Sequence, residues 1–235
     1  MVADLTMKNI SYKKIFWKIK RDISSSFLLM FILRLDRKGG IPFSSRNRKG
    51  QTILRYYVDS FIESKTGEIH GDILEIGRSI YFSQINRKQI NSYHCLDIEM
   101  FPDIDIIADI QSMPQIQNDT FDSIVCTQVL EHVKNPYNAI NEFYRILRPS
   151  GKLLLTVPFL NSYHMEPHDY WRFTEYALRE LLSDFSSTDI VNLGNTTSFI
   201  LATLGISSAD VDRNILLRKE KNIKFPVIIG AIAEK

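Results

Sequence analysis

The sequence predicts an α/β protein built on an open, largely parallel β-sheet with helices on both faces. Short apolar stretches typical of buried strands alternate with helix-like stretches from residue 72 onward. Acidic residues end several of these strands, at the edge where such sheets bind ligands. The chain has 235 residues, 44% of them hydrophobic, which is enough to bury a sizeable core.

The strands are predicted in order along the chain. Seven segments have the composition of strands, namely 72–77, 92–98, 103–109, 121–129, 152–159, 187–193 and 225–235. Between the fourth and fifth, Asn135 is predicted to cap a helix that has Pro136 at its first position. Pro149 and Gly151 are expected to end this helix. Its buried face combines apolar residues at helical spacing, Ala139, Ile140, Phe143 and Leu147.

Charge divides the chain into two parts. Residues 1–55 hold thirteen Lys or Arg and three Asp, a net charge of +10, so the total of +2 leaves −8 for the remainder. Apolar residues at helical spacing alternate with Lys and Arg over residues 12–23, which predicts a basic amphipathic helix. It either attaches to an anionic membrane surface or docks on protein with a solvated cationic face. We therefore expect a basic, partly helical arm at 1–50 and a folded domain at 51–235.

Several functional classes are disfavoured. No apolar run reaches the roughly 20 residues of a membrane span, and no secretory cleavage site follows the start. We therefore expect a cytoplasmic protein, peripheral at the inner membrane face if the arm binds lipid. Cys95 and Cys126 lie in apolar strands without CxxC spacing and are predicted to be reduced core residues. The acidic body lacks interleaved basic and aromatic residues, which argues against nucleic acid as a partner.

The carboxyl ends of the early strands form the candidate ligand site. Glu75 and Gly77 end the first strand, Asp97 ends the second and Asp109 ends the third. Ligands of such sheets bind beyond these ends. A carboxylate about 20 residues after the first strand suits the two vicinal hydroxyls of a ribose. We assign this role to Asp97, although a strand-end Asp also serves as a cap or turn residue.

Several segments together resemble the class I S-adenosylmethionine-dependent methyltransferases, over roughly residues 70–185. They are DILEIG, LDIE, ADIQSMP, FDSIVCTQVLEHVKNP and RILRPSGKLLLTVPF. The resemblance implies a Rossmann-like sheet of seven strands, mostly parallel with an antiparallel last strand, and S-adenosyl-L-methionine as cofactor. It also implies cofactor contacts: Glu75 and Gly77 at the methionine end, Asp97 at the ribose, Asp109 and Ile110 at the adenine, and Gln128 beside the methyl group.

A narrower resemblance concerns RKGQTILRYYVDSFI, DYWRFT and LGNTTSFILATLG. These segments resemble type 11-like methyltransferases of bacteria that are associated with glycosyltransferases and polysaccharide biosynthesis. This implies O-methylation of a hydroxyl on a sugar or on a glycan or lipid-linked precursor. His132 lies beside the expected methyl site, either as a site residue or as a helix-start residue.

The turn after the first strand departs from the methyltransferase pattern. Its sequence, IGRSIY, has Ser79 and Tyr81 where the family usually has two further glycines. Glycine permits positive φ and close backbone approach to a ligand, so the turn is expected to be wider or differently shaped. The alternative function is therefore a catalytically inactive protein of the same fold that binds a glycosyltransferase or another enzyme. A nicotinamide-dependent oxidoreductase is disfavoured, because these side chains would obstruct a pyrophosphate.

The segment NSYHMEPHDYWRFT, residues 161–174, follows the fifth strand, where an acceptor-binding loop is expected. His168 is the first candidate for a base and His164 the second, with Asp169 orienting one of them. Alternatively, these side chains pin a structured loop. Candidates for acceptor contacts are Tyr170 and Trp171, which could stack on a sugar, and Arg172, which could bind a phosphate or carboxylate. No metal site is predicted, because the two histidines lack a third ligand at clear spacing.

Overall fold

The computed structural model describes residues 51–164, 168–220 and 223–235. The chain divides into two units, Met1–Pro42 and Phe43–Lys235, and all described residues belong to the second. The predicted N-terminal arm, with its amphipathic helix and its attachment to a membrane or to protein, lies outside the described residues. The domain boundary at residue 50 stays a prediction. Within the described ranges, no helix is long and apolar enough to cross a membrane.

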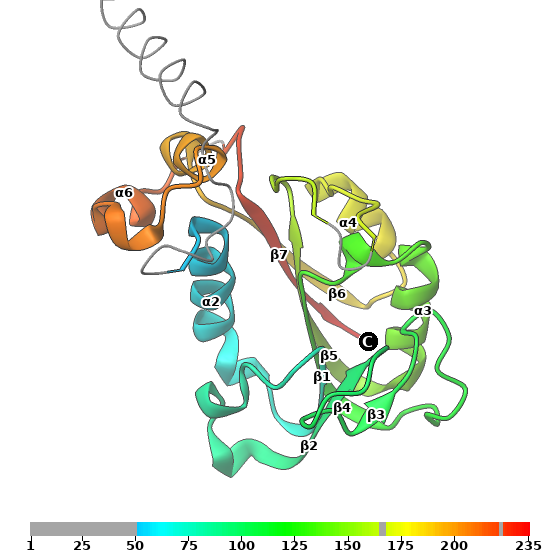
Figure 1. Ribbon diagram of the computed structural model, residues 1–235. Helices are drawn as coiled ribbons and strands as arrows, with labels where there is room; N and C mark the ends of the chain where they lie inside the picture. The colour runs from blue at the N-terminus through cyan, green and yellow to red at the C-terminus, as the bar shows by residue number, and fades with distance from the viewer. Residues whose placement is uncertain (1–50, 165–167, 221–222) are drawn as a thin grey trace, which may run out of the picture. The chain divides into compact units, whose positions relative to one another are not determined.

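A seven-stranded mixed sheet forms the centre of the second unit (Figure 1). The strands are β1 (Gly71–Ile76), β2 (Ile90–Asp97), β3 (Ile106–Ile107), β4 (Phe121–Thr127), β5 (Leu147–Pro158), β6 (Ser187–Leu193) and β7 (Ile228–Glu234). Their order is β3-β2-β1-β4-β5-β7-β6, and β7 runs antiparallel to both of its neighbours while the other pairs are parallel. The predicted fold class, including the antiparallel last strand, is confirmed.

Helices cover both faces of this sheet (Figure 1). One face carries α2 (Ile53–Lys65), α5 (Thr196–Thr203) and α6 (Arg213–Leu217), and the other carries α3 (Pro136–Ile146) and α4 (Glu175–Leu181). Each face has its own cluster of buried apolar side chains. Cys95 and Cys126 are buried and free, which confirms their prediction as reduced core residues.

Helix α3 begins where the sequence predicts and ends earlier. The Asn135 side chain accepts from the backbone N–H groups of Tyr137 and Asn138, so the predicted cap with Pro136 at the first position is confirmed. The prediction that Pro149 and Gly151 end the helix is wrong. The helix stops at Ile146, because Leu147 turns to an extended conformation and pairs with Phe121 as the first residue of β5.

The connection from β1 to β2 contains no α-helix. Residues 77–89 form two 3-10 turns, Phe82–Gln84 and Arg87–Gln89, before β2 begins. The predicted third strand is also shorter than expected, since β3 has only two residues of the predicted segment 103–109. The first crossover is therefore short, and its turn does not lead into the N-terminus of a helix.

Gly230 of β7 gives helix α2 its close approach to the sheet. A Cβ atom at this position would lie 2.7 Å from Cε2 of the buried Phe61 ring on α2. We predict that Gly230→Ala lowers the free energy of unfolding by about 1–3 kcal/mol through overpacking, measured by urea denaturation. Gly67→Ala is the matched control, because a Cβ there would have no atom within 4 Å. Equal losses in both variants would contradict this packing.

Candidate functional site

A cavity of about 710 Å³ lies beyond the carboxyl ends of β1, β2 and β4, a size typical of small-molecule sites. Five of the six residues predicted to contact a cofactor line it: Gly77, Asp97, Asp109, Ile110 and Gln128. These residues follow different strands, and the parallel sheet brings them together because its carboxyl ends meet at one edge. The exception is Glu75.

The side chain of Glu75 points into the protein and supports the turn after β1. It is 2% exposed, and its carboxylate accepts hydrogen bonds from the backbone N–H of Ile80 (3.1 Å) and Tyr81 (3.4 Å) and from the hydroxyl of Tyr93. Burial raises the pKa of this carboxyl, while these donors oppose the shift. Glu75 is thus placed to hold the backbone beside the cavity, and it does not line the cavity itself.

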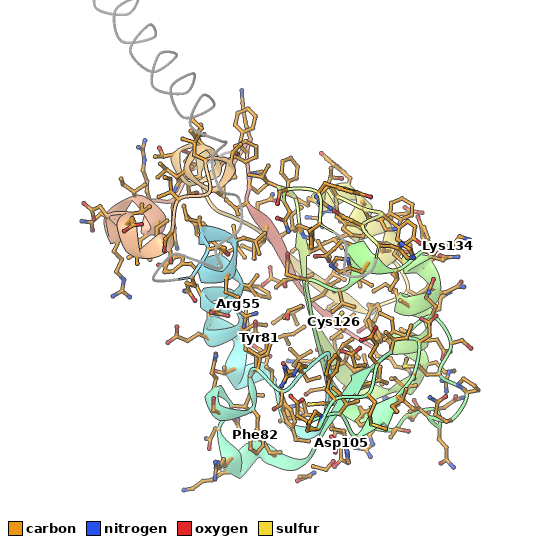
Figure 2. All side chains as sticks on the ribbon, viewed as in Figure 1. Arg55, Tyr81, Phe82, Asp105, Cys126 and Lys134 are labelled. Carbon is orange, nitrogen blue, oxygen red and sulfur yellow. The ribbon has the colours of Figure 1, made fainter. Side chains whose placement is uncertain are left out.

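The glycine-poor turn leaves the cavity open. Gly77 has φ +91°, a conformation that favours glycine, and its N–H donates to the Leu96 carbonyl at 2.7 Å. Tyr81 is fully buried in the core cluster under α2, where Arg55 lies 5.3 Å from its ring centre (Figure 2). Arg78 is paired with Asp103 at 3.1 Å. Ser79 and Tyr81, which stand where the family usually has glycine, do not line the cavity, and Arg78 does not line it either. These side chains therefore do not fill the site.

The end of β2 offers a carboxylate beside apolar surface. Asp97 lines the cavity, and its Oδ1 accepts from the backbone N–H of Glu99 at 3.1 Å. Among the described residues, none donates a hydrogen bond to its Oδ2. Ile98 follows it with a side chain that is 61% exposed, and Ile110 lies across the same cavity. A carboxylate that accepts hydroxyl protons next to two apolar side chains fits the ribose and the flat base of a nucleoside.

Gln128 forms the wall beyond β4 in a strained conformation. Its φ is +55°, and its backbone N–H and side-chain Nε2 donate to the carbonyl and the hydroxyl of Thr156 at 2.9 and 3.2 Å. The left-handed conformation costs on the order of 1 kcal/mol for a non-glycine residue. Its Oε1 is buried and has no hydrogen-bond partner among the described residues. Gln128 lines the cavity, so this unpartnered acceptor belongs to a residue of the cavity wall.

Backbone hydrogen bonds tie the segment after β5 to the turn after β4. The carbonyl of Glu131 accepts from the N–H groups of Tyr170 and Trp171 at 2.8 and 3.3 Å. The His132 ring Nδ1 donates to the carbonyl of His168 at 2.6 Å. His132, His168 and Tyr170 all line the cavity, and the rings of His168 and Tyr170 lie 5.6 Å apart. The predicted first base and the predicted stacking residue Tyr170 are therefore at the cavity.

Asp169 and Arg172 form the internal support of this segment. The Asp169 side chain is 1% exposed and accepts from Arg172 Nη1 and Nη2 at 2.5 and 2.8 Å, which holds the pKa of its carboxyl far below the usual range. It also accepts from the backbone N–H of His164 and lies 3.4 Å from His164 Nδ1, in line with the predicted orienting role. Arg172 further donates to the carbonyls of Asn161, Ser162 and Trp171.

Two predicted acceptor residues are therefore engaged elsewhere. The guanidinium of Arg172 is occupied by the segment that it supports, and the geometry does not favour its predicted role as an anion-binding residue. The indole Nε1 of Trp171 donates to the Val133 carbonyl at 2.9 Å, and Trp171 does not line the cavity. His164 lies outside the cavity wall as well, next to His132.

Sequence reasoning did not assign several lining residues, among them Ile98, Phe101, Val129, Val133 and Lys134. Ile98 directly follows the predicted ribose carboxylate, so its place after the strand end was an available signal. Phe101, by contrast, reaches the cavity from the irregular connection between β2 and β3, where no periodicity marks it. A residue in such a connection can be assigned only from the folded chain.

Loss of the Arg172 guanidinium leaves a buried carboxylate without its counter-ion. We predict that Arg172→Met lowers the free energy of unfolding by about 2–3 kcal/mol, measured by chemical denaturation. Arg179→Met is the matched control, because Arg179 pairs with Glu175 on the exposed face of α4 and such pairs contribute about 0.3–0.5 kcal/mol. A loss in Arg172→Met no larger than in the control would show that Asp169 does not depend on this arginine.

Comparison with known proteins places this site in a family context. Residues 66–155 match the family model described as "Methyltransferase domain". A human protein described as "Thiol S-methyltransferase TMT1B" is 30% identical over 93 residues, which cover 40% of this chain and 34% of that protein. The curated relatives that match this chain are covered over about a third of their length or less.

Solved structures agree on the fold. A SAM-dependent methyltransferase from Archaeoglobus fulgidus superposes with a TM-score of 0.54 at 13% identity, covering 77% of this chain and 94% of that one. A phosphoethanolamine N-methyltransferase 2 from Haemonchus contortus, in complex with S-adenosyl-L-methionine, gives a TM-score of 0.52 at 13% identity, covering 76% and 52%. The chain therefore has the Rossmann-like fold of these methyltransferases, and its residues 66–155 are similar to the methyltransferase domain family.

Proposed function

We propose that this protein is an S-adenosyl-L-methionine-dependent methyltransferase that methylates a hydroxyl of a sugar or of a glycan or lipid-linked precursor. One observation supports this most directly: the strand-end residues Asp97, Ile110 and Gln128 share a single cavity with His168 and Tyr170. The first three suit a nucleoside cofactor, and the last two suit an acceptor. A cavity that spans both groups can hold two reactants next to each other.

The described residues fit the proposed cofactor. The carboxylate of Asp97 would accept both ribose hydroxyls, and Ile98 and Ile110 would enclose the adenine. The unpartnered Oε1 of Gln128 would accept a hydrogen bond from a donor at the methionine end. When bound, the cofactor supplies a methyl group that is made electrophilic by the attached sulfonium. No pyrophosphate is present in it, so the turn after β1 needs fewer glycines than a dinucleotide site.

Acceptor chemistry would take place between Gln128 and His168. The oxygen of an acceptor hydroxyl would form a bond to the methyl carbon as the bond from that carbon to sulfur breaks, which would leave S-adenosylhomocysteine. The hydroxyl proton would pass to the imidazole of His168, which lines the cavity. Positioning supplies much of the rate in a direct transfer of this kind, and backbone bonds from Glu131 and His132 hold residues 168–171 in place. Tyr170, 46% exposed beside His168, offers an aromatic face to an acceptor ring.

The sugar or glycan acceptor is supported by the narrower resemblance of DYWRFT and its neighbouring segments to methyltransferases associated with glycosyltransferases. The alternative is a catalytically inactive protein of this fold that binds another enzyme. It is less favoured, because the side chains of Arg78 and Tyr81 leave the cavity free. Cofactor binding separates the two functions, since only the enzyme requires it.

Binding of S-adenosylmethionine and S-adenosylhomocysteine tests the proposal. We expect isothermal titration of the full chain to give one site, and Asp97→Asn to weaken it roughly 10- to 100-fold through loss of hydrogen bonds to a charged acceptor. Asp184→Asn is the control, because Asp184 is exposed and precedes the amino end of β6, at the opposite edge of the sheet. Absence of binding by the unchanged protein would refute the proposed function in favour of the inactive alternative.

His168 can be tested apart from cofactor binding. We predict that His168→Ala lowers kcat for methyl transfer about 100-fold or more, because a positioned base contributes at least that much, while cofactor affinity changes less than about twofold. Methyl transfer from labelled cofactor to a panel of nucleotide sugars and oligosaccharides measures the first quantity, and titration with S-adenosylhomocysteine measures the second. His70→Ala, at an exposed histidine outside the cavity, is the control. Parallel loss of turnover and affinity would assign His168 a structural role.

A further inference from the structure

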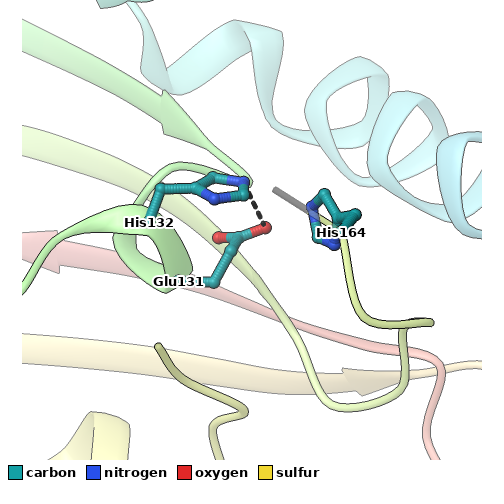
Figure 3. A group of neighbouring side chains, drawn as sticks. All are labelled: Glu131, His132 and His164. Carbon is teal, nitrogen blue, oxygen red and sulfur yellow. Dashed lines mark ion pairs between the residues drawn. The ribbon is translucent and has the colours of Figure 1, made fainter. Parts of the chain in front are cut away.

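Three side chains near the acceptor end of the cavity form a cluster with the composition of a metal site. Glu131, His132 and His164 each offer a ligand atom, and these atoms all lie within 4.8 Å of one another (Figure 3). The sequence suggested a histidine pair without a third ligand at clear spacing. The fold instead pairs His164 with two adjacent residues from the turn after β4. The cluster therefore draws on segments that follow two neighbouring strands.

Glu131 is the unusual member of the cluster. Its side chain is fully buried, and neither carboxylate oxygen has a hydrogen-bond partner among the described residues. A buried carboxylate without a partner is strongly unfavourable when ionised. Its nearest cationic candidate is His132, whose Nε2 lies 3.9 Å from Oε1 (Figure 3). A cation held between the two would satisfy both oxygens of Glu131.

Both histidines are held in the tautomer that a metal requires. His132 Nδ1 lies 2.6 Å from the His168 carbonyl, and His164 Nδ1 lies 3.1 Å from the Ser162 carbonyl. A carbonyl only accepts, so each Nδ1 carries a proton, and Nε2 is the nitrogen that a metal can bind in the neutral ring. Histidine ligands usually donate their second nitrogen to a carbonyl or carboxylate in this way. These hydrogen bonds also fix the orientation of each ring.

The spacing and the local charge agree with an ion. Metal–ligand bonds of about 2.0–2.2 Å keep ligand atoms within about 4.4 Å of one another. The 3.9 Å between His132 Nε2 and Glu131 Oε1 already fits this limit. All ligand atoms of the cluster lie within 4.8 Å of one another, so the widest separation needs only a small movement. The nearby cation Arg172 is neutralised by Asp169, with which it shares two hydrogen bonds. Repulsion of a divalent ion by Arg172 is thereby reduced.

We propose that Glu131, His132 and His164 bind a divalent transition-metal ion such as Zn²⁺, Co²⁺ or Mn²⁺. Two imidazoles with one carboxylate form a donor set that suits these ions and not Mg²⁺, which prefers oxygen ligands. Three protein ligands leave coordination positions open for another molecule, as in catalytic metal sites. Because His132 lines the cavity, an open position would face it.

A bound ion would narrow the class of hydroxyl that can act as methyl acceptor. This inference about the acceptor rests on the proposed function. An acceptor oxygen that occupies the open position would lie near His168 and Gln128, which line the same cavity. A bound cation lowers the pKa of a coordinated hydroxyl, and the released proton would pass to the imidazole of His168. The acceptors favoured by this geometry are those with a hydroxyl that coordinates a cation, alone or with a neighbouring oxygen on the same ring.

Metal binding can be measured without the cofactor. The full chain, stripped with a chelator, is titrated with Co²⁺ by visible absorption and with Zn²⁺ by calorimetry. We expect one equivalent to bind. Glu131→Gln and His164→Ala are expected to weaken binding at least 100-fold, because each removes a ligand, whereas His70→Ala should bind like the unchanged protein. The glutamine variant removes a buried charge and keeps the shape. Should it fail to fold, His164→Ala carries the test, since the His164 side chain is partly exposed.

The outcomes for the two proposals are distinguishable. Absence of Co²⁺ and Zn²⁺ binding, or equal affinity in the ligand variants, overturns the metal site. Methyl transfer at an unchanged rate in the chelated protein overturns the role of the ion in acceptor binding and leaves the proposed function intact. Metal binding by a protein that binds no S-adenosylhomocysteine leaves the site standing and refutes the proposed function. A rise in melting temperature with Zn²⁺ that disappears in Glu131→Gln provides independent support.

Discussion

The candidate site depends on the hydrogen bonds that the buried carboxylate of Glu75 accepts. It lies at the end of the central strand β1 and accepts hydrogen bonds from the backbone of the following turn and from Tyr93 on β2. In this way one side chain fixes the path of residues 77–81 by accepting hydrogen bonds from two of their backbone N–H groups. Tyr81 is directed into the core under α2 and the cavity edge is left to Gly77, so the missing glycines do not block the site.

Three carboxylates that are equivalent in the sequence pattern become different through burial. Glu75, Asp97 and Asp109 each end a predicted strand, yet Glu75 is buried and engaged, whereas the other two line the cavity. Asp109 shares its oxygens with the backbone and side chain of Gln111, while Asp97 is engaged at one oxygen only. Asp97 therefore has the greatest capacity of the three to accept hydrogen bonds from a ligand.

The fold and the strand-end residues that share the cavity could be predicted from the sequence, because both follow from strand periodicity and from the common edge of parallel strands. Asn135 with Pro136 at a helix start is a similar local signal. The part of the site formed by the segments after β4 and β5 could be predicted only in part. That Arg172 pairs with Asp169 instead of a ligand, and that Glu131 lies beside His164, depends on how residues from different segments meet in space. Local sequence patterns do not show contacts between distant segments. The sequence therefore did not indicate Glu131 as a third ligand beside the histidines.

Hydrogen bonds between the segments after β4 and β5 hold this side of the candidate site together. β4 and β5 are neighbours in the sheet, so the turn that begins at Gln128 and the segment that begins after Pro158 leave the same edge side by side. The carbonyl of Glu131 and the ring of His132 then bind the backbone of residues 168–171, while Asp169 and Arg172 close the segment on itself. A buried carboxyl at this junction is unfavourable for stability alone. Its cost is understandable if the junction holds a cation, because hydrogen bonds to the His168 and Ser162 carbonyls fix the two imidazoles close to this carboxyl.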